Sequence, residues 1–245
     1  MATDPFGAPA HPMALHTVLI PGLLCSPRLY EPMLGAVWQH GGVTVADTRR
    51  DDTMAGMARR LLDGAPERFA LAGLSMGGYV ALEVMRQAPE RVRALALLST
   101  SARPDTPEQT AARREQIAMA RSGRYDELVQ GAFPLVVDAS NEQDDELRAT
   151  LVAMSREVGP EVFCVQQEAV IGRADSRALL GSISCPTLVV HGAGDRLIAP
   201  ENGAELAAGI ADAEHLVLER CGHSPTLERP DAVGPAVGAL LDRVG

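Results

Sequence analysis

The chain has 245 residues, a length that suits a single α/β domain with one sizeable hydrophobic core. Its formal net charge is −10, which argues against nucleic-acid and anionic-membrane partners, because both require a concentrated basic surface. All 22 basic residues are arginine, so the chain lacks the lysine of a Walker-A phosphate site, a Schiff base or a pyridoxal phosphate anchor. Small neutral or cationic ligands remain compatible with this composition.

No segment is both long and apolar enough to span a bilayer. The stretch 1–14 has neither a basic cluster nor an apolar run, so we expect no signal peptide and a soluble, cytoplasmic protein. The cysteines lie far apart, without a C-x-x-C or zinc-binding pattern, which predicts buried free thiols and no metal site. They are Cys25, Cys164, Cys185 and Cys221.

Short apolar runs alternate with segments of helical periodicity, which is typical of a mostly parallel sheet flanked by helices. The apolar runs lack polar alternation, as expected for parallel strands that are buried on both faces. The predicted strands span 16–20, 43–46, 69–73, 92–99, 187–191 and 214–218. The predicted helices span 53–63, 76–87, 200–210 and 230–243, each beginning at a polar or proline start signal.

Residues 103–182 follow a different pattern, with no convincing strand and with charged, amphipathic helical stretches. We expect breaks in these helices at Gly123, Pro134, Asn141 and Gly159-Pro160. The sequence therefore predicts an α/β core of residues 1–102 and 183–245, with residues 103–182 inserted as a small helical cap.

A G-x-S-x-G motif centred on Ser75 lies where a predicted strand gives way to a predicted helix. A sharp turn at this junction strains its apex residue, and the small neighbours Gly73 and Gly77 make room for it. A packing turn and a phosphate-binding loop are the alternatives, but the phosphate site lacks its lysine and no G-x-G-x-x-G follows the first strand. We predict that Ser75 is an exposed nucleophile at a helix N-terminus.

A serine nucleophile needs a histidine as general base and a carboxylate that orients the histidine. Among six histidines, only His223 follows a strand and precedes a helix at the carboxyl edge of the sheet, where ligands bind in open α/β folds. Asp195 lies in a glycine-containing turn at the same edge, and taken alone it could be an ordinary turn aspartate. The chain order Ser75, Asp195, His223 favours a catalytic triad.

Backbone N–H groups must stabilise the oxyanion that forms during attack on an acyl group. Met76, directly after the nucleophile, should supply one donor, and the turn at Gly22 should supply the other from Leu23, our first choice, or from Leu24. Apolar residues could line the substrate pocket or could simply form the interior of the cap. The candidates are Leu24, Phe133, Met154 and Phe163.

With these residues assembled, the chain resembles the α/β-hydrolase superfamily from about Leu15 to the last predicted helix, and within it the serine esterases with a helical cap. The resemblance implies a central sheet flanked by helices, a cap in 103–182 and no cofactor. Pro21-Gly22 stands where many relatives carry His-Gly, which bears on the shape of the pocket. Few residues precede the first strand, too few for the usual N-terminal hairpin, which bears on the number of strands.

The expected reaction is hydrolysis of a carboxylic ester or related small acyl compound through an acyl-serine intermediate. Perhydrolases, thioesterases, lactonases and C–C hydrolases share this fold and triad, so they stay open as alternatives. A ligand receptor that keeps the triad and signals through its cap is an alternative of another class. The sequence makes no prediction of oligomeric state.

Overall fold

A computed structural model describes residues 15–245 of the protein. Residues 1–14, on which the expectation of no signal peptide rests, lie outside this range. Among the described residues, no helix is long and apolar enough to cross a membrane.

Six strands form one sheet in the order β2-β1-β3-β4-β5-β6, and every neighbouring pair is parallel. This sheet confirms the α/β class predicted from the apolar runs, and each strand bound lies within one residue of its prediction. The strands are β1 (Thr17–Ile20), β2 (Val43–Val45), β3 (Phe69–Leu74), β4 (Val92–Leu98), β5 (Thr187–Gly192) and β6 (Ala213–Leu218).

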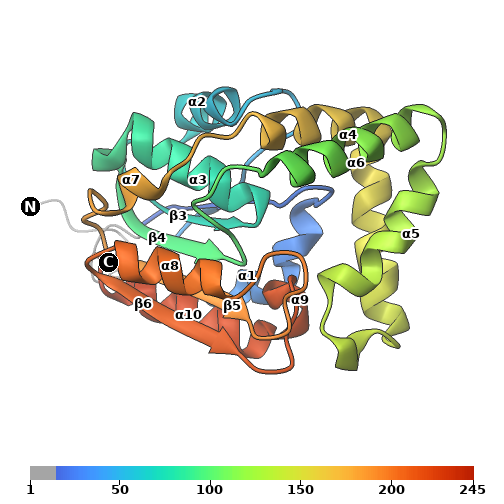
Figure 1. Ribbon diagram of the computed structural model, residues 1–245. Coiled ribbons are helices and arrows are strands. Elements are labelled where there is room, and N and C mark those ends of the chain that lie inside the picture. The colour runs from blue at the N-terminus through green and yellow to red at the C-terminus, as the bar shows by residue number, and fades with distance from the viewer. Residues whose placement is uncertain (1–14) are drawn as a thin grey trace, which may run out of the picture.

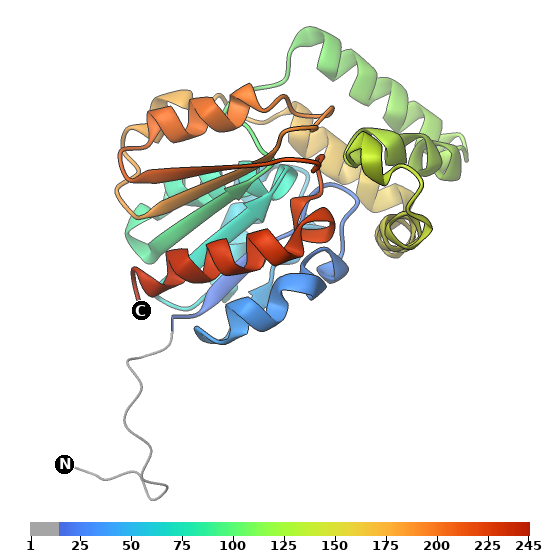
Figure 2. The same ribbon diagram turned by 90° about the horizontal axis from the view of Figure 1, so that it is seen from below.

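Helices cover both faces of the sheet (Figure 1, Figure 2). One face carries α2 (Met54–Gly64), α3 (Met76–Gln87) and α8 (Glu201–Gly209), and the other carries α1 (Leu34–Trp38) and α10 (Pro230–Asp242). Alternate residues of β3 and β4 therefore enter two separate core clusters, as the twofold periodicity of a strand requires. The remaining short helices outside the inserted segment 103–171 are η1 (Pro27–Met33), η2 (Pro89–Arg91), α7 (Arg177–Leu180) and α9 (Pro225–Glu228).

The two edge strands depart from the prediction that all six strands are buried. Thr44 of β2 is exposed, and so are Glu214, His215 and Val217 of β6. Each edge strand has a neighbour on one side only, so its side chains are less covered than those of a central strand.

The inserted segment forms α4 (Pro107–Arg121), α5 (Tyr125–Val136), η3 (Ala139–Asn141) and α6 (Asp145–Ile171), which extend beyond the carboxyl ends of the strands (Figure 1). Gly123 separates α4 from α5, and Gly159 interrupts α6 with a non-helical φ of 80°. The predicted break at Pro134 is wrong, because this proline lies in the last turn of α5 and only a late helical hydrogen bond is lost there. The assignment of 103–182 as a separate cap stays a prediction.

Candidate active site

Ser75 lies at the turn between β3 and α3 in a strained backbone conformation, with a φ of 54°. Its amide donates to the carbonyl of Leu98, with an N–O distance of 2.9 Å, which anchors the turn to β4. A Cβ at Gly73 would lie 2.2 Å from the carbonyl oxygen of Gly77, and a Cβ at Gly77 would lie 2.0 Å from that of Ile20. The glycines of the motif are thus required by close backbone approaches.

Thr100 supports the same turn from the loop after β4. Its hydroxyl donates to the carbonyl of Ser75 over 2.8 Å, and its side chain lies where a Cβ at Gly78 would be. Sequence reasoning missed Thr100, because a threonine after a strand carries no motif of its own.

The structure brings Asp195 and His223 together, as predicted for the acid and the base. Nδ1 of His223 lies 2.8 Å from Oδ2 of Asp195, and both side chains are buried. A carboxylate only accepts hydrogen bonds, so Nδ1 carries the hydrogen and Nε2 of His223 remains free to accept a proton.

Four groups surround the carboxylate of Asp195. Its Oδ1 accepts from the amides of Leu197 and Ile198, each over 2.9 Å, and its Oδ2 faces both His223 and His191. Burial opposes the charge on Asp195, but the two histidines and the Ile198 amide outweigh burial and hold the pKa of Asp195 well below its ordinary range. Asp195 is therefore ionised at neutral pH.

His191 is a second histidine at this carboxylate that the sequence did not identify. It is fully buried at the end of β5, and its Nε2 lies 2.9 Å from the carbonyl oxygen of Ile198 and 3.3 Å from Oδ2 of Asp195. A carbonyl oxygen only accepts, so Nε2 carries a hydrogen that also faces the carboxylate.

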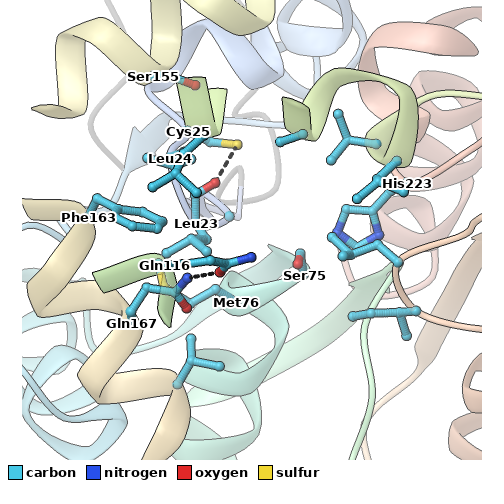
Figure 3. A pocket seen from close by; sticks show the side chains of 18 of the residues that line it. Leu23, Leu24, Cys25, Ser75, Met76, Gln116, Ser155, Phe163, Gln167 and His223 are labelled. Atoms are coloured by element: carbon cyan, nitrogen blue, oxygen red, sulfur yellow. Dashed lines mark hydrogen bonds between the residues drawn. The ribbon is translucent and has the colours of Figure 1, made fainter. Parts of the chain in front are cut away.

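Ser75 and His223 line one cavity of about 340 Å³ between the carboxyl edge of the sheet and helices α4, α5 and α6. In Figure 3 the ring of His223 is directed toward Ser75, with Leu23 and Met76 on the opposite side of the serine. The structure thus gathers the predicted nucleophile, base and oxyanion residues around one space.

The amides of Leu23 and Met76 are free for an oxyanion, because neither donates a hydrogen bond within residues 15–245. The amide of Leu24 is not free, since it donates to Oε1 of Gln166 over 3.2 Å. This bond favours Leu23 over Leu24 as the second donor. Leu24 also has a positive φ of 63°, an uncommon conformation for a residue with a side chain, at this turn.

The apolar pocket residues divide into two groups. Leu24, Phe133 and Phe163 line the cavity, as expected. Met154 does not: it is fully buried in the core cluster between the sheet and α10, and this prediction is wrong. A methionine at helical spacing fits either position, so the sequence pattern could not separate them.

The cysteines are all free thiols, two of them buried and two half-buried. Cys25 borders the cavity beside the oxyanion loop, and burial raises the pKa of its thiol to about 12. This thiol is therefore protonated at neutral pH and does not compete with Ser75 as a nucleophile. Residues 15–245 contain no group of three or more histidine, cysteine, aspartate or glutamate side chains arranged to hold a metal ion.

Known proteins share sequence and fold with this chain. The model of a family described as the alpha/beta hydrolase family matches residues 15–236. The chain belongs to this family. Among the curated members, a pimeloyl-[acyl-carrier protein] methyl ester esterase from Nitrosomonas europaea is 28% identical over 196 residues, which cover 77% of each chain.

Two further alpha/beta hydrolases widen the range of named activities. A 2-hydroxy-6-oxononadienedioate/2-hydroxy-6-oxononatrienedioate hydrolase from Paraburkholderia xenovorans is 31% identical over 192 residues, covering 76% of this chain and 66% of the relative. A solved thermophilic esterase from Thermogutta terrifontis superposes with a TM-score of 0.86 at 27% identity, covering 95% of this chain and 91% of that one.

Proposed function

We propose that the protein is a serine hydrolase that cleaves a small carboxylic ester through an acyl-Ser75 intermediate. The observation that carries the proposal is the 2.8 Å contact between His223 Nδ1 and Asp195 Oδ2 beside the cavity that Ser75 enters from its strained turn. These side chains come from three separate loops at the carboxyl ends of β3, β5 and β6. A purely structural role would not require that convergence on one cavity.

In the first half of the reaction, Nε2 of His223 takes the hydroxyl proton while Oγ of Ser75 attacks the ester carbonyl. The amides of Leu23 and Met76 stabilise the negative oxygen of the tetrahedral intermediate. The bond to the alcohol then breaks, and the alcohol leaves with the proton held by His223. An acyl-Ser75 ester remains.

In the second half, water gives a proton to His223 and attacks the acyl-enzyme carbonyl. The bond to Oγ breaks, the carboxylic acid is released, and His223 returns its proton to Ser75. Asp195 stays ionised throughout and stabilises the imidazolium that forms twice in the cycle.

The named relatives support an ester substrate and also mark the alternative. Two of them are esterases, whereas the Paraburkholderia relative is named for hydrolysis of an oxo-dienedioate. We favour an ester over a C–C substrate because both an esterase sequence and an esterase structure match at least 77% of this chain and of the relative.

The experiment combines covalent labelling with turnover. Wild type and Ser75→Ala are treated with a fluorophosphonate, intact masses are measured, and p-nitrophenyl esters of increasing acyl length are assayed. We expect one label and turnover in the wild type, and neither in Ser75→Ala. Ser122→Ala is the matched control, because Ser122 is exposed and its hydroxyl bonds only to the carbonyl of Met119 in the preceding helix. This variant should be labelled at Ser75 to the same extent as wild type.

The other outcomes separate the alternatives. Labelling of Ser75 without ester turnover would reject the esterase and leave a C–C substrate or a receptor. Absence of labelling in the wild type would contradict Ser75 as the nucleophile.

A further inference from the structure

The wall of the cavity beside α4 and the end of α6 carries two arginines, Arg113 on α4 and Arg173 just after α6. No aspartate or glutamate is among the residues of the described chain that line this cavity. The chain as a whole carries a net charge of −10, so a cavity with only cationic charges runs against the average composition. The charge of the cavity lining is therefore opposite in sign to the net charge of the chain.

One buried carboxylate balances only part of this charge. Asp105, whose side chain is 1% exposed, pairs with Nε of Arg113 over 2.8 Å and with Nη1 of Arg173. The side chain of Arg173 is itself 6% exposed, and its guanidinium stacks 4.4 Å from the centre of the Tyr79 ring. Two arginines share one carboxylate, and within residues 15–245 neither Nη2 donates a hydrogen bond.

A chain of side-chain amides extends the same wall toward Ser75. Nη1 of Arg113 donates to Gln167 over 2.8 Å, and Gln167 lies 2.6 Å from Gln116. Because arginine can only donate, the bonded atom of Gln167 is its oxygen, so its NH₂ group donates to the oxygen of Gln116. The NH₂ group of Gln116 is then left as a donor, and Figure 3 shows it directed into the cavity toward Ser75.

These groups share one property: Arg113, Arg173 and Gln116 line the cavity, and within residues 15–245 each keeps an N–H donor that makes no hydrogen bond to the protein, while the excess charge is positive. Planar, donor-rich sites of this kind match the oxygens of a carboxylate. The remaining wall, which includes Val129, Phe133 and Phe163, is apolar and suits a hydrocarbon chain.

We propose that this wall, formed by Arg113, Arg173 and Gln116, binds a carboxylate of the substrate, so that the preferred substrates are half-esters of aliphatic dicarboxylic acids. This inference rests on the proposed ester hydrolysis at Ser75. It replaces the expectation of neutral or cationic ligands, because the net charge of the chain does not describe the cavity. The apolar wall holds the methylene chain between the anchored carboxylate and the ester carbonyl.

The test measures kcat/KM for monomethyl esters of the diacids from succinate to suberate, each against the methyl ester of the monocarboxylic acid of equal length. The readout is the ratio of the two values. We expect wild type to prefer at least one half-ester by about ten-fold or more, since hydrogen bonds to a charged group contribute this much. Arg113→Gln should lower that ratio by about ten-fold.

Arg113→Gln leaves Asp105 with one partner and could unfold the protein, so a second variant is needed. Gln116→Glu keeps an acceptor for Gln167 and replaces the donor in the cavity by a negative charge, which should also lower the ratio by at least about ten-fold. Arg114→Gln is the matched control: Arg114 is exposed, lies next to Arg113 in the chain and does not line this cavity, so the ratio should stay within about two-fold.

Binding to Ser75→Ala separates this inference from the proposed function. Ser75→Ala is titrated in a calorimeter with the preferred half-ester, or with adipate if no ester is turned over. We expect binding to Ser75→Ala and no binding to the double variant that also carries Gln116→Glu. Binding without turnover would contradict the esterase and retain the carboxylate site. Turnover with no preference for half-esters would overturn the carboxylate site and retain the esterase.

Discussion

At the scale of single residues, the charge of Asp195 links catalysis to stability. The unfolded chain binds a proton at this carboxyl near the ordinary pKa of 3.8, whereas the native state keeps the carboxyl ionised to lower pH. The stabilising contribution of Asp195 is therefore complete above about pH 5 and is lost as the pH falls through the lowered native pKa.

Asp195→Asn should remove this dependence. Between about pH 5 and pH 3, the free energy of unfolding should fall less steeply in the variant than in wild type, which urea titrations at each pH would measure. At neutral pH, kcat should fall by about a thousand-fold or more, because His223 loses the group that orients it. Parallel pH profiles in the two proteins would contradict the role given to Asp195.

The sequence predicted the residues whose proposed roles follow from a motif or from chain order, namely Ser75, Asp195 and His223, and the structure brings them to one cavity edge. It missed Thr100, His191 and Gln166, which act through contacts between residues far apart in the chain. Gln166 and Leu24, for example, are 142 residues apart. No local sequence pattern predicts such a contact, because the contact depends on how α6 packs on the loop after β1.

At the scale of elements, α6 is fastened to the core through Gln166, a fully buried side chain. Its oxygen accepts from the amide of Leu24, and its nitrogen lies 3.3 Å from the carbonyl and hydroxyl oxygens of Thr48. One side chain thus joins α6 to the loops after β1 and β2, and it holds the turn that contains the Leu23 amide.

Gln166→Leu should leave these backbone groups buried without partners. We expect the free energy of unfolding to fall by about 1–3 kcal/mol and kcat to fall by about ten-fold, with a smaller change in KM. Denaturant titration and steady-state kinetics would measure both effects. Gln87→Leu, the same change at an exposed site on α3, should alter kcat by less than about two-fold.

The interruption of α6 at Gly159 is a second property at this scale. Because φ is 80° there and a Cβ would meet only the Glu161 carboxylate at 3.9 Å, Gly159→Ala should destabilise through backbone strain alone, by about 1–2 kcal/mol. Gly131→Ala, inside α5 with no atom near the added Cβ, should instead stabilise by about 0.5–1 kcal/mol. Thermal denaturation of both variants would test the opposite signs.

Helices and strands were predictable within one residue wherever the periodicity was strong, as in β3 and α3. The exposure of β2 and β6 could not be predicted from the sequence, because the order of strands in the sheet decides which strands form its edges. The continuation of α5 through Pro134 was not predicted either. The sequence alone does not distinguish a proline that is tolerated in the last turn of a helix from a proline that ends the helix.

At the scale of the whole molecule, the C-terminus lies at the end of the sheet away from α4, α5 and α6 (Figure 1). The cavity lies at the carboxyl ends of the strands, whereas Asp242 near the chain end contacts His40, just before β2 begins. A domain attached beyond Gly245 is therefore expected to lie away from the cavity and from helices α4, α5 and α6.

Fusion of a fluorescent protein after Gly245 should leave kcat/KM within about two-fold of wild type. The same domain inserted after Asn141, between α5 and α6, should lower kcat/KM by more than about ten-fold, because these helices form the cavity wall. Equal activity of the two fusions would contradict the placement of the cavity beside α5 and α6 and far from the chain end.

The division between strand ends and inserted helices has an evolutionary consequence. The residues proposed for proton transfer lie in loops after β3, β5 and β6, whereas the donors proposed to select the substrate lie on α4 and just after α6. Point mutations on those helices can redirect the protein to a new metabolite while the older chemistry continues unchanged. Such a chain can acquire new substrates gradually, through intermediates that remain functional at every step.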